Sequence, residues 1–260
     1  MTGMIARAAP AIVCLLVLGL LWEGAVRALH VPSYFLPTPS GVIAALIDNA
    51  PLFLRSAWAT LATSLIALLI ATALGLALTL ALSLSQTLER AVAPLAVTLQ
   101  VTPVVAIAPL VVIWVGLAHA ERAILILAAI VAFFPVFSAS LTGLQSADRD
   151  LERLFSLYRA GPLDRLTRLR LPAATPFILA GVKIAGGLAL IGTVVAEFVA
   201  GTGAAQGLAW RILEAGNRLA TASMFAALLA LALLGVALNM VLSALERWAL
   251  ARFGAPRGDG

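Results

Sequence analysis

Long apolar stretches alternate with short polar segments along almost the whole chain. A helix needs about 20 apolar residues to cross the hydrocarbon core of a bilayer, and runs of about that length recur along the sequence. The predicted spans cover residues 8–28, 57–84, 94–117, 122–145, 177–200 and 224–248. The alternating ten-residue pattern of membrane β-strands does not occur. The pattern therefore predicts an all-α, polytopic membrane protein of about six transmembrane helices.

The segment between the first two predicted spans has three prolines within eight residues, in the stretch HVPSYFLPTPSGV. Ser40 follows these prolines and is a residue type that suits a helix N-cap. We therefore expect a short amphipathic helix that begins near Gly41 and lies at the membrane interface.

A charged segment, residues 147–176, separates two of the apolar runs and carries six arginines and four acidic residues. Its periodicity predicts a helix over about 150–159, a turn at 160–162 and a second helix that ends at Leu171-Pro172. In the first helix, apolar side chains recur at spacings of three and four residues and form one face. These side chains are Leu151, Leu154, Phe155 and Tyr158. The segment is thus predicted to be a helical hairpin outside the bilayer, which covers its own bundle or docks in the groove of a partner.

The composition supports a membrane protein, because 62% of the residues are apolar and 11% are charged. The formal net charge of +5 does not indicate nucleic-acid binding, because the arginines gather at the ends of predicted spans. Eleven arginines fall in the segments that are cytoplasmic if the N-terminus is cytoplasmic, and five fall in the outer segments. The positive-inside rule therefore predicts cytoplasmic termini and a cytoplasmic hairpin.

Small residues at four-residue spacing form stripes on two of the predicted spans. One stripe comprises Ala67, Ala71, Gly75 and Thr79, and the other comprises Gly192, Ala196 and Ala200. Such stripes let helix backbones approach closely in a membrane. The second and fifth spans are thus candidates for the packed centre of the bundle.

Glu197 is the carboxylate that lies deep in a predicted span. A buried acid in hydrocarbon requires a partner, a water-filled cavity or a proton. The residue has either a role in the transport pathway or a structural role, in which it bonds neighbouring backbone or Arg211. Lys183 starts the same span and is expected to extend to the cytoplasmic headgroups.

The sequence offers no catalytic constellation and no metal site. His30 and His119 lie in predicted outer loops without nearby cysteines or carboxylates at ligand spacing, and Cys14 lies in an apolar run. A phosphate-binding G-x-x-x-x-G-K-[ST] loop is absent. The chain is therefore expected to be no enzyme and to need no cofactor. If ATP drives it, another polypeptide hydrolyses the ATP.

Several stretches resemble the membrane subunits of bacterial binding-protein-dependent ATP-binding cassette importers of type I, in the sulfonate, taurine, nitrate and thiamine-precursor branch. The resemblance is carried by YFLPTPSGVIAAL, PLAVTLQVTPVVAIAPLVVIWVG, FFPVF, RLRLPAATPFILAGVKIA and VVAEFVAG. It implies an N-terminal helix with an outer loop (1–56), a type I transmembrane domain (57–248) that contains the hairpin, and a cytoplasmic tail (249–260).

Members of this family carry a pattern of E-A-A, three residues, G, nine residues and I-x-L-P in the coupling helices that seat on the ATPase subunit. In this chain the pattern is degraded. Anchored on Leu171-Pro172, it places Arg153, Leu154 and Phe155 at E-A-A, Arg159 at the glycine and Leu169 at the isoleucine. Anchored instead on Gly161, it leaves Leu-Pro two residues early. Glu152 supplies an acid one position early.

The resemblance implies a permease subunit in the bacterial inner membrane that forms the pathway for a small organic solute. The implied partners are an ATPase subunit, a periplasmic substrate-binding protein and a second permease copy, as a homodimer. The stretch AEFVAGTGAAQGLAWRILEAGNRL is more similar to the thiamine-precursor pyrimidine branch than to the taurine and sulfonate branch. Two alternatives are a secondary transporter that couples an ion through Glu197 and a membrane scaffold subunit that transports nothing.

Overall fold

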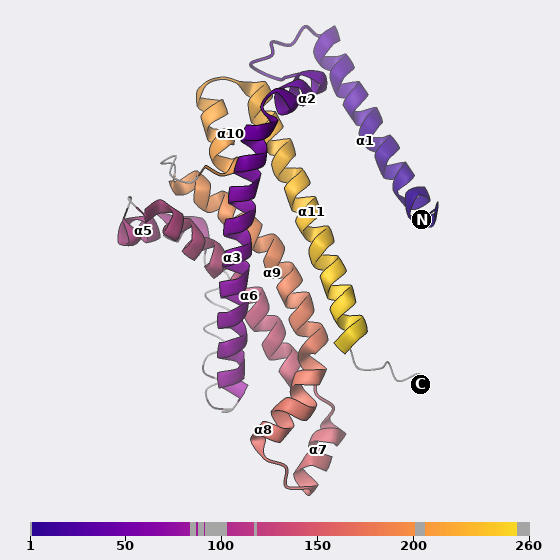
Figure 1. The fold of residues 1–260 in the computed structure, drawn as a ribbon, viewed down its shortest axis with the longest axis vertical. Coiled ribbons are helices and arrows are strands. Elements are labelled where there is room, and N and C mark those ends of the chain that lie inside the picture. The colour runs from indigo at the N-terminus through magenta and orange to yellow at the C-terminus, as the bar shows by residue number, and fades with distance from the viewer. Residues whose placement is uncertain are drawn as a thin grey trace. The chain divides into compact units, whose positions relative to one another are not determined.

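The computed structural model describes residues 2–83, 87, 91, 103–116, 119–200 and 206–253, and every regular element in this part of the chain is helical (Figure 1). The helices in chain order are α1 (Thr2–Ala28), α2 (Pro39–Asp48), α3 (Ala50–Ser83), α5 (Val104–Val115), α6 (Ala120–Gln145), α7 (Arg149–Leu157), α8 (Pro162–Arg165), the π-helical turn η2 (Leu166–Arg170), α9 (Leu171–Ala200), α10 (Leu208–Asn217) and α11 (Thr221–Phe253). The chain divides into two compact units. Unit 1 comprises Met1–Trp58 and Gln206–Leu233, and unit 2 comprises Ala59–Ala205 and Leu234–Gly260.

Four helical stretches within the described residues are long and apolar enough to cross a membrane. They are Ala50–Ser83, Ala120–Gln145, Pro162–Ala200 and Thr221–Arg252. They coincide with four of the six predicted spans, although each extends beyond the predicted bounds. The predicted span 8–28 lies within α1. The predicted span 94–117 overlaps α5, while residues 94–102 and 117 lie outside the described residues.

In unit 2, α6 and α9 lie side by side and are joined through glycines (Figure 1). A Cβ atom built on Gly181 would lie 2.6 Å from the Ala139 Cβ, and one built on Gly143 would lie 2.8 Å from the Phe177 Cβ. Real Cβ atoms do not approach other atoms so closely. The absence of a side chain at these glycines therefore lets the two helices pack backbone to backbone.

The predicted small-residue stripes are confirmed as packing surfaces. All four stripe residues of α3 are buried, and a Cβ on Gly75 would lie 3.1 Å from the Val136 Cγ1 of α6. A Cβ on Gly192 of α9 would lie 3.0 Å from the Ala128 Cα of α6. The second and fifth predicted spans therefore both pack closely against α6.

The C-terminal part of α11 also packs on α9 in unit 2. Gly186 of α9 faces the side chain of Leu242, and the Lys183 Nζ lies 2.8 Å from the Glu246 Oε2. Lys183 thus has a carboxylate partner on the neighbouring helix, which the expected extension to lipid headgroups did not include. The pair is favourable because a charge in a membrane helix is stabilised by a partner of opposite charge.

In unit 1, the short helix predicted after the three prolines is present as α2, but Ser40 does not cap it. The Thr38 Oγ1 accepts a hydrogen bond from the Gly41 N–H at 3.1 Å, because the helix starts at Pro39, whose fixed φ suits the first helical position. Ser40 instead donates its backbone N–H and its hydroxyl to the Glu23 carboxylate of α1, at 2.9 and 2.8 Å. These bonds join α1 to the first turn of α2.

Helix α10 of unit 1 is amphipathic and holds the predicted partner of Glu197. The Arg211 guanidinium donates to the Ser56 Oγ at 3.0 Å and to the Glu214 Oε2 at 2.7 Å. Arg211 is thus engaged by groups of its own unit.

Candidate functional site

The first arm of the hairpin (residues 147–176) is α7, whose two ends are set by the local sequence. The Asp148 carboxylate caps the N-terminus and accepts the Asp150 N–H at 2.7 Å. At the C-terminus, the Ala160 N–H bonds to the Phe155 carbonyl at 2.9 Å, and Arg159 adopts a φ of 53°. This is a Schellman motif with a left-handed residue, a conformation that favours glycine. Helix α7 is thus shorter than the predicted helix over 150–159.

The second arm begins at Pro162 and continues into the membrane helix, so the predicted end at Leu171-Pro172 is wrong. Residues 162–200 form one uninterrupted helical stretch. The Leu171 N–H bonds to the Leu166 carbonyl, five residues back, in the π-turn η2. A proline removes one N–H donor, but a rearranged turn next to it re-pairs the backbone and allows the helix to continue.

An ion pair joins the two arms of the hairpin. The Arg170 Nε lies 2.6 Å from the Glu152 Oε1, and both side chains are partly buried, at 32% and 23% exposure. At the turn, the Arg165 Nε donates to the Ala160 carbonyl at 3.1 Å. The other ion pairs of the hairpin, Arg153–Asp150 and Arg168–Asp164, connect residues one helical turn apart on the surface. Glu152 and Arg170 thus connect α7 to the last residue of η2.

Helix α7 leaves most of its apolar side chains exposed. It has no buried residue, and Leu151, Leu154, Leu157 and Tyr158 are among the exposed large hydrophobic residues. Leu157 and Tyr158 are the most open of these, at 81% and 80%. Sequence reasoning missed Leu157, although it follows Leu154 at the helical spacing of three residues. Phe155, by contrast, is partly buried.

The other residues predicted for this site occupy different positions in the hairpin. Leu169 is buried within η2, and Leu171 is partly buried at the start of α9. Arg153 is exposed beside Asp150. Gly161 precedes α8 with a φ of −65°, which any residue can adopt, and Pro172 is exposed in the first turn of α9.

Glu197 lies in a buried polar seam between α3 and α9 in unit 2. The Thr60 hydroxyl donates to the Glu197 Oε1 at 3.0 Å, and Glu197 is only 4% exposed. One turn along, the Ser64 Oγ lies 3.0 Å from the Thr193 Oγ1. Hydroxyls that bond to a carboxylate and to one another satisfy buried polar groups, as a core requires. The seam is an element of helix packing with a carboxylate at one end.

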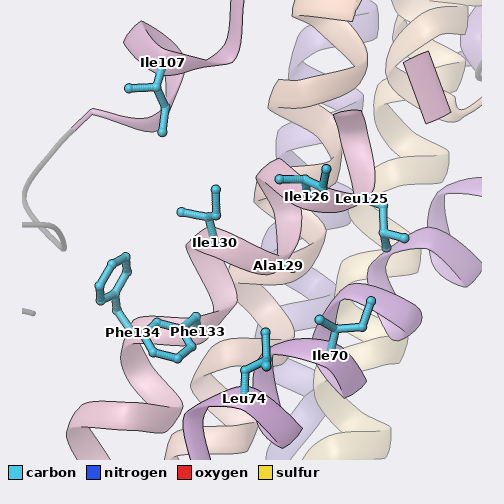
Figure 2. A pocket seen from close by; sticks show the side chains of 9 residues that line it. All are labelled: Ile70, Leu74, Ile107, Leu125, Ile126, Ala129, Ile130, Phe133 and Phe134. Carbon is cyan, nitrogen blue, oxygen red and sulfur yellow. The ribbon is translucent and has the colours of Figure 1, made fainter. Parts of the chain in front are cut away.

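Unit 2 also contains an apolar pocket of about 480 Å³ (Figure 2). Its lining comes from Ile70 and Leu74 of α3, from Ile107 of α5 and from α6 residues between 125 and 134, including Phe133 and Phe134. All nine lining residues are apolar. The pocket therefore offers dispersion contacts to a ligand but no side-chain hydrogen bond.

Comparison with known proteins connects these features to a family. A family model described as "Binding-protein-dependent transport system inner membrane component" matches residues 71–253, which is more than half of the chain. This range includes the hairpin, α9 and the polar seam residues of α9.

Curated relatives match over most of their length. A probable ABC transporter permease protein of Haemophilus influenzae is 33% identical over 237 residues, which cover 91% of this chain and 93% of the relative. The formylaminopyrimidine transport permease protein ThiX of Halalkalibacterium halodurans is 33% identical, with coverages of 85% and 86%. The riboflavin transport system permease protein RibX of Chloroflexus aurantiacus is 34% identical, with coverages of 90% and 87%.

The matched range and the near full-length similarity to permease proteins agree with the helical membrane fold. They also favour the importer reading over a secondary transporter or a scaffold subunit. The chain belongs to the family of inner membrane components of binding-protein-dependent transport systems.

Proposed function

We propose that this permease subunit imports a small organic solute and receives the energy of ATP hydrolysis through the hairpin, residues 147–176. The observation that carries the proposal is the exposed apolar surface of α7, formed by Leu151, Leu154, Leu157 and Tyr158. A short amphipathic helix with an uncovered apolar face is suited to a groove on a partner protein. In this family the partner is the ATPase subunit.

The backbone of the hairpin favours one of the two ways to match the coupling pattern of the family. Anchoring on Leu171-Pro172 puts Arg159 at the glycine position, and Arg159 has the left-handed φ that favours glycine. Gly161 has a negative φ and does not need to be glycine. On this anchor, Arg153, Leu154 and Phe155 occupy the E-A-A positions, and Leu169 occupies the isoleucine position.

The continuity of the second arm with α9 supports a mechanism of transmission. A displacement of the second arm passes into α9 without an intervening loop, because residues 162–200 form one helical stretch. Helix α9 contacts α3, α6 and α11 within unit 2. Nucleotide-driven closure of two ATPase subunits would thus bias the bundle between two global states, as alternating access requires. We assign Glu197 a structural role in this movement, as part of the seam that joins α3 to α9.

The arrangement in the membrane follows from the distribution of arginines. We propose six transmembrane helices, cytoplasmic termini and a cytoplasmic hairpin, with the domain bounds 1–56, 57–248 and 249–260. Helix α11 reaches Phe253, so part of the proposed tail is helical. A periplasmic binding protein delivers the solute, and a second copy of this chain completes the pathway.

For the solute, we propose a thiamine-precursor pyrimidine, with taurine or another sulfonate as the alternatives. The similarity to a relative named for formylaminopyrimidine transport supports the pyrimidine. Uptake of the labelled pyrimidine by cells that express the importer, with labelled taurine in a parallel assay, separates these solutes.

The docking of the hairpin is tested by co-purification of the ATPase subunit with the tagged chain. The variant Leu154→Asp/Leu157→Asp should lose the ATPase subunit, because a carboxylate in an apolar groove is not solvated. Leu219→Asp is the matched control, since Leu219 is also an exposed leucine and lies outside the hairpin. Full recovery of the ATPase with the double variant would contradict the proposal.

A further inference from the structure

The ion pair between Glu152 and Arg170 is the charged contact that spans the hairpin among the described residues. It connects positions 18 residues apart, with 2.6 Å between the Arg170 Nε and the Glu152 Oε1. The remaining ion pairs in this segment join residues three or four positions apart within one arm. This pair therefore connects the two arms, whereas the other pairs contribute only within one arm.

Few other contacts hold α7 in place. No residue of α7 is buried, so packing on the rest of unit 2 contributes little to its position. The turn supplies the Arg165–Ala160 bond, which lies at the far end of the hairpin from Glu152. Because both members of the Glu152–Arg170 pair are partly buried, the pair is less screened by solvent than an exposed one.

Arg170 is the last residue of η2 and immediately precedes α9. The other member of the pair, Glu152, lies in α7, whose apolar side chains are exposed. A force applied to α7 can reach α9 through the turn at 160–162, through the ion pair, or through residues 146–148 and α6, which packs on α9. The route through the turn also passes Arg159, which precedes the turn and has a left-handed backbone, and it is longer than the route through the ion pair.

We propose that Glu152 is a positioning residue whose ion pair with Arg170 makes α7 and α9 move together when the ATPase subunit moves. This inference rests on the proposed docking of the hairpin on that subunit. It assigns Glu152 to the interior of the hairpin and not to the surface that contacts the partner. The exposed residues Leu151, Leu154, Leu157 and Tyr158 form that surface.

The test follows the movement of α9 itself, in the complete complex of this chain with its ATPase subunit in lipid nanodiscs. Replacement of the single native cysteine, Cys14→Ser, provides a background for one reporter. Ile184→Cys on the exposed side of α9 carries an environment-sensitive fluorophore. The signal is the change in fluorescence on addition of ATP, and the ATPase subunit that remains bound is quantified in the same sample.

Glu152→Arg and Arg170→Glu should each reduce the ATP-dependent fluorescence change by about threefold or more, within the range of coupling measured for interacting pairs. The ATPase subunit should stay bound. The double variant Glu152→Arg/Arg170→Glu should restore the signal, because the opposite charges meet again with their places exchanged. The matched control is Asp164→Arg/Arg168→Asp and its two single variants, which alter an exposed pair within one arm and should leave the signal unchanged.

Two milder variants protect the test against a hairpin that fails to fold. Glu152→Gln removes the charge with little change of shape and should reduce the signal, whereas Arg170→Lys keeps the charge and should retain most of it. An unchanged signal in the single charge reversals would overturn the inference. So would a double variant that does not recover, or release of the ATPase subunit by Glu152→Arg, which would place Glu152 on the partner surface.

The two proposals fail in different ways. If Leu154→Asp/Leu157→Asp still releases the ATPase but the charge exchange does not restore the signal, the role of Glu152 is wrong and the docking stands. If the leucine variant retains the ATPase, the docking itself is wrong, and with it the inference.

Discussion

Individual residues of this chain hold conformations that their side chains do not favour. Arg159 ends α7 with a φ of 53°, and His30 and Leu219 end α1 and α10 in the same way. In each case the next residue donates a 6→1 backbone bond of the Schellman type. After Leu219, for example, the Ala220 N–H bonds to the Ala215 carbonyl at 2.9 Å. The helix ends are thus set by backbone hydrogen bonds at sites where glycine would cost less.

Arg159→Gly should therefore stabilise the hairpin by about 1 kcal/mol, since a side chain in the left-handed region costs roughly that amount. Hydrogen exchange of the α7 amides in the purified chain measures the effect as slower exchange. The control is Gly161→Ala, where φ is negative and the nearest atom to a new Cβ, the Asp164 Oδ2, lies 3.8 Å away. Faster exchange in Arg159→Gly would contradict this account of the turn.

At the scale of elements, α9 is the helix on which the others of unit 2 are assembled. It packs on α6 through glycines, on α11 through Gly186 and the Lys183–Glu246 pair, and on α3 through the hydroxyl seam. Close backbone contact is the main source of helix association where lipid tails are as apolar as the side chains.

Gly181→Ala should destabilise the bundle by about 2 kcal/mol, because the new methyl group would overlap the Ala139 side chain and the Pro135 carbonyl. Gly187→Ala is the matched control on the same helix, since a Cβ there meets nothing within 4 Å. It should stabilise the helix by about 0.5–1 kcal/mol through lower backbone entropy of the unfolded state. Thermal unfolding of the two variants in detergent compares them, and equal midpoints would argue against glycine-mediated packing.

Which elements the sequence could predict depends on whether the determinants are local. The apolar runs, the small-residue stripes and the amphipathic α7 depend on residues within one helix, and the structure contains them. The Thr38 cap was missed because Thr38 and Ser40 are both capping residues, and the choice depends on where Pro39 places the first turn. The end of the second arm was missed because a proline motif reads as a stop, while a π-turn lets the helix continue.

Contacts between distant segments could not be predicted. Thr60 and Glu197 are 137 residues apart, and Glu152 and Arg170 are separated by a turn whose angle the pattern does not specify. The sequence identified Glu197 and Glu152 as notable acids, but it could not identify the hydroxyl or the guanidinium that each one meets. Such pairings follow from the packing of helices and not from spacing along one helix.

At the scale of the whole molecule, the family assignment and the helical fold describe a polytopic membrane permease. The stretch Pro162–Ala200 contains 39 residues, so at 1.5 Å per residue it is about 58 Å long, against a hydrocarbon core of about 30 Å. A helix of this length can cross the bilayer and still extend well beyond it. The extension supports the proposed position of the hairpin outside the membrane.

The proposed orientation predicts which residues a membrane-impermeant thiol reagent can reach in intact cells. In a Cys14→Ser background, Ser156→Cys in α7 should be labelled after the membrane is permeabilised and not before. Ser33→Cys, in the loop between α1 and α2, should be labelled in intact cells. Both serines are exposed, so access depends on the side of the membrane. The reverse pattern would invert the topology and remove the hairpin from the ATPase.

The π-turn η2 has a consequence for how this chain is compared with its relatives. A bond from Leu171 to the fifth residue before it encloses one residue more than an α-helical turn does. The turn at Leu166–Arg170 therefore contains one residue more than an α-helical turn, while the faces of the helix beyond it keep their directions. A relative with an ordinary turn here would place the same faces in the same directions with one residue fewer. A linear motif that is counted across this turn therefore needs a check from the backbone, and the left-handed φ of Arg159 is that check for the anchor on Leu171-Pro172.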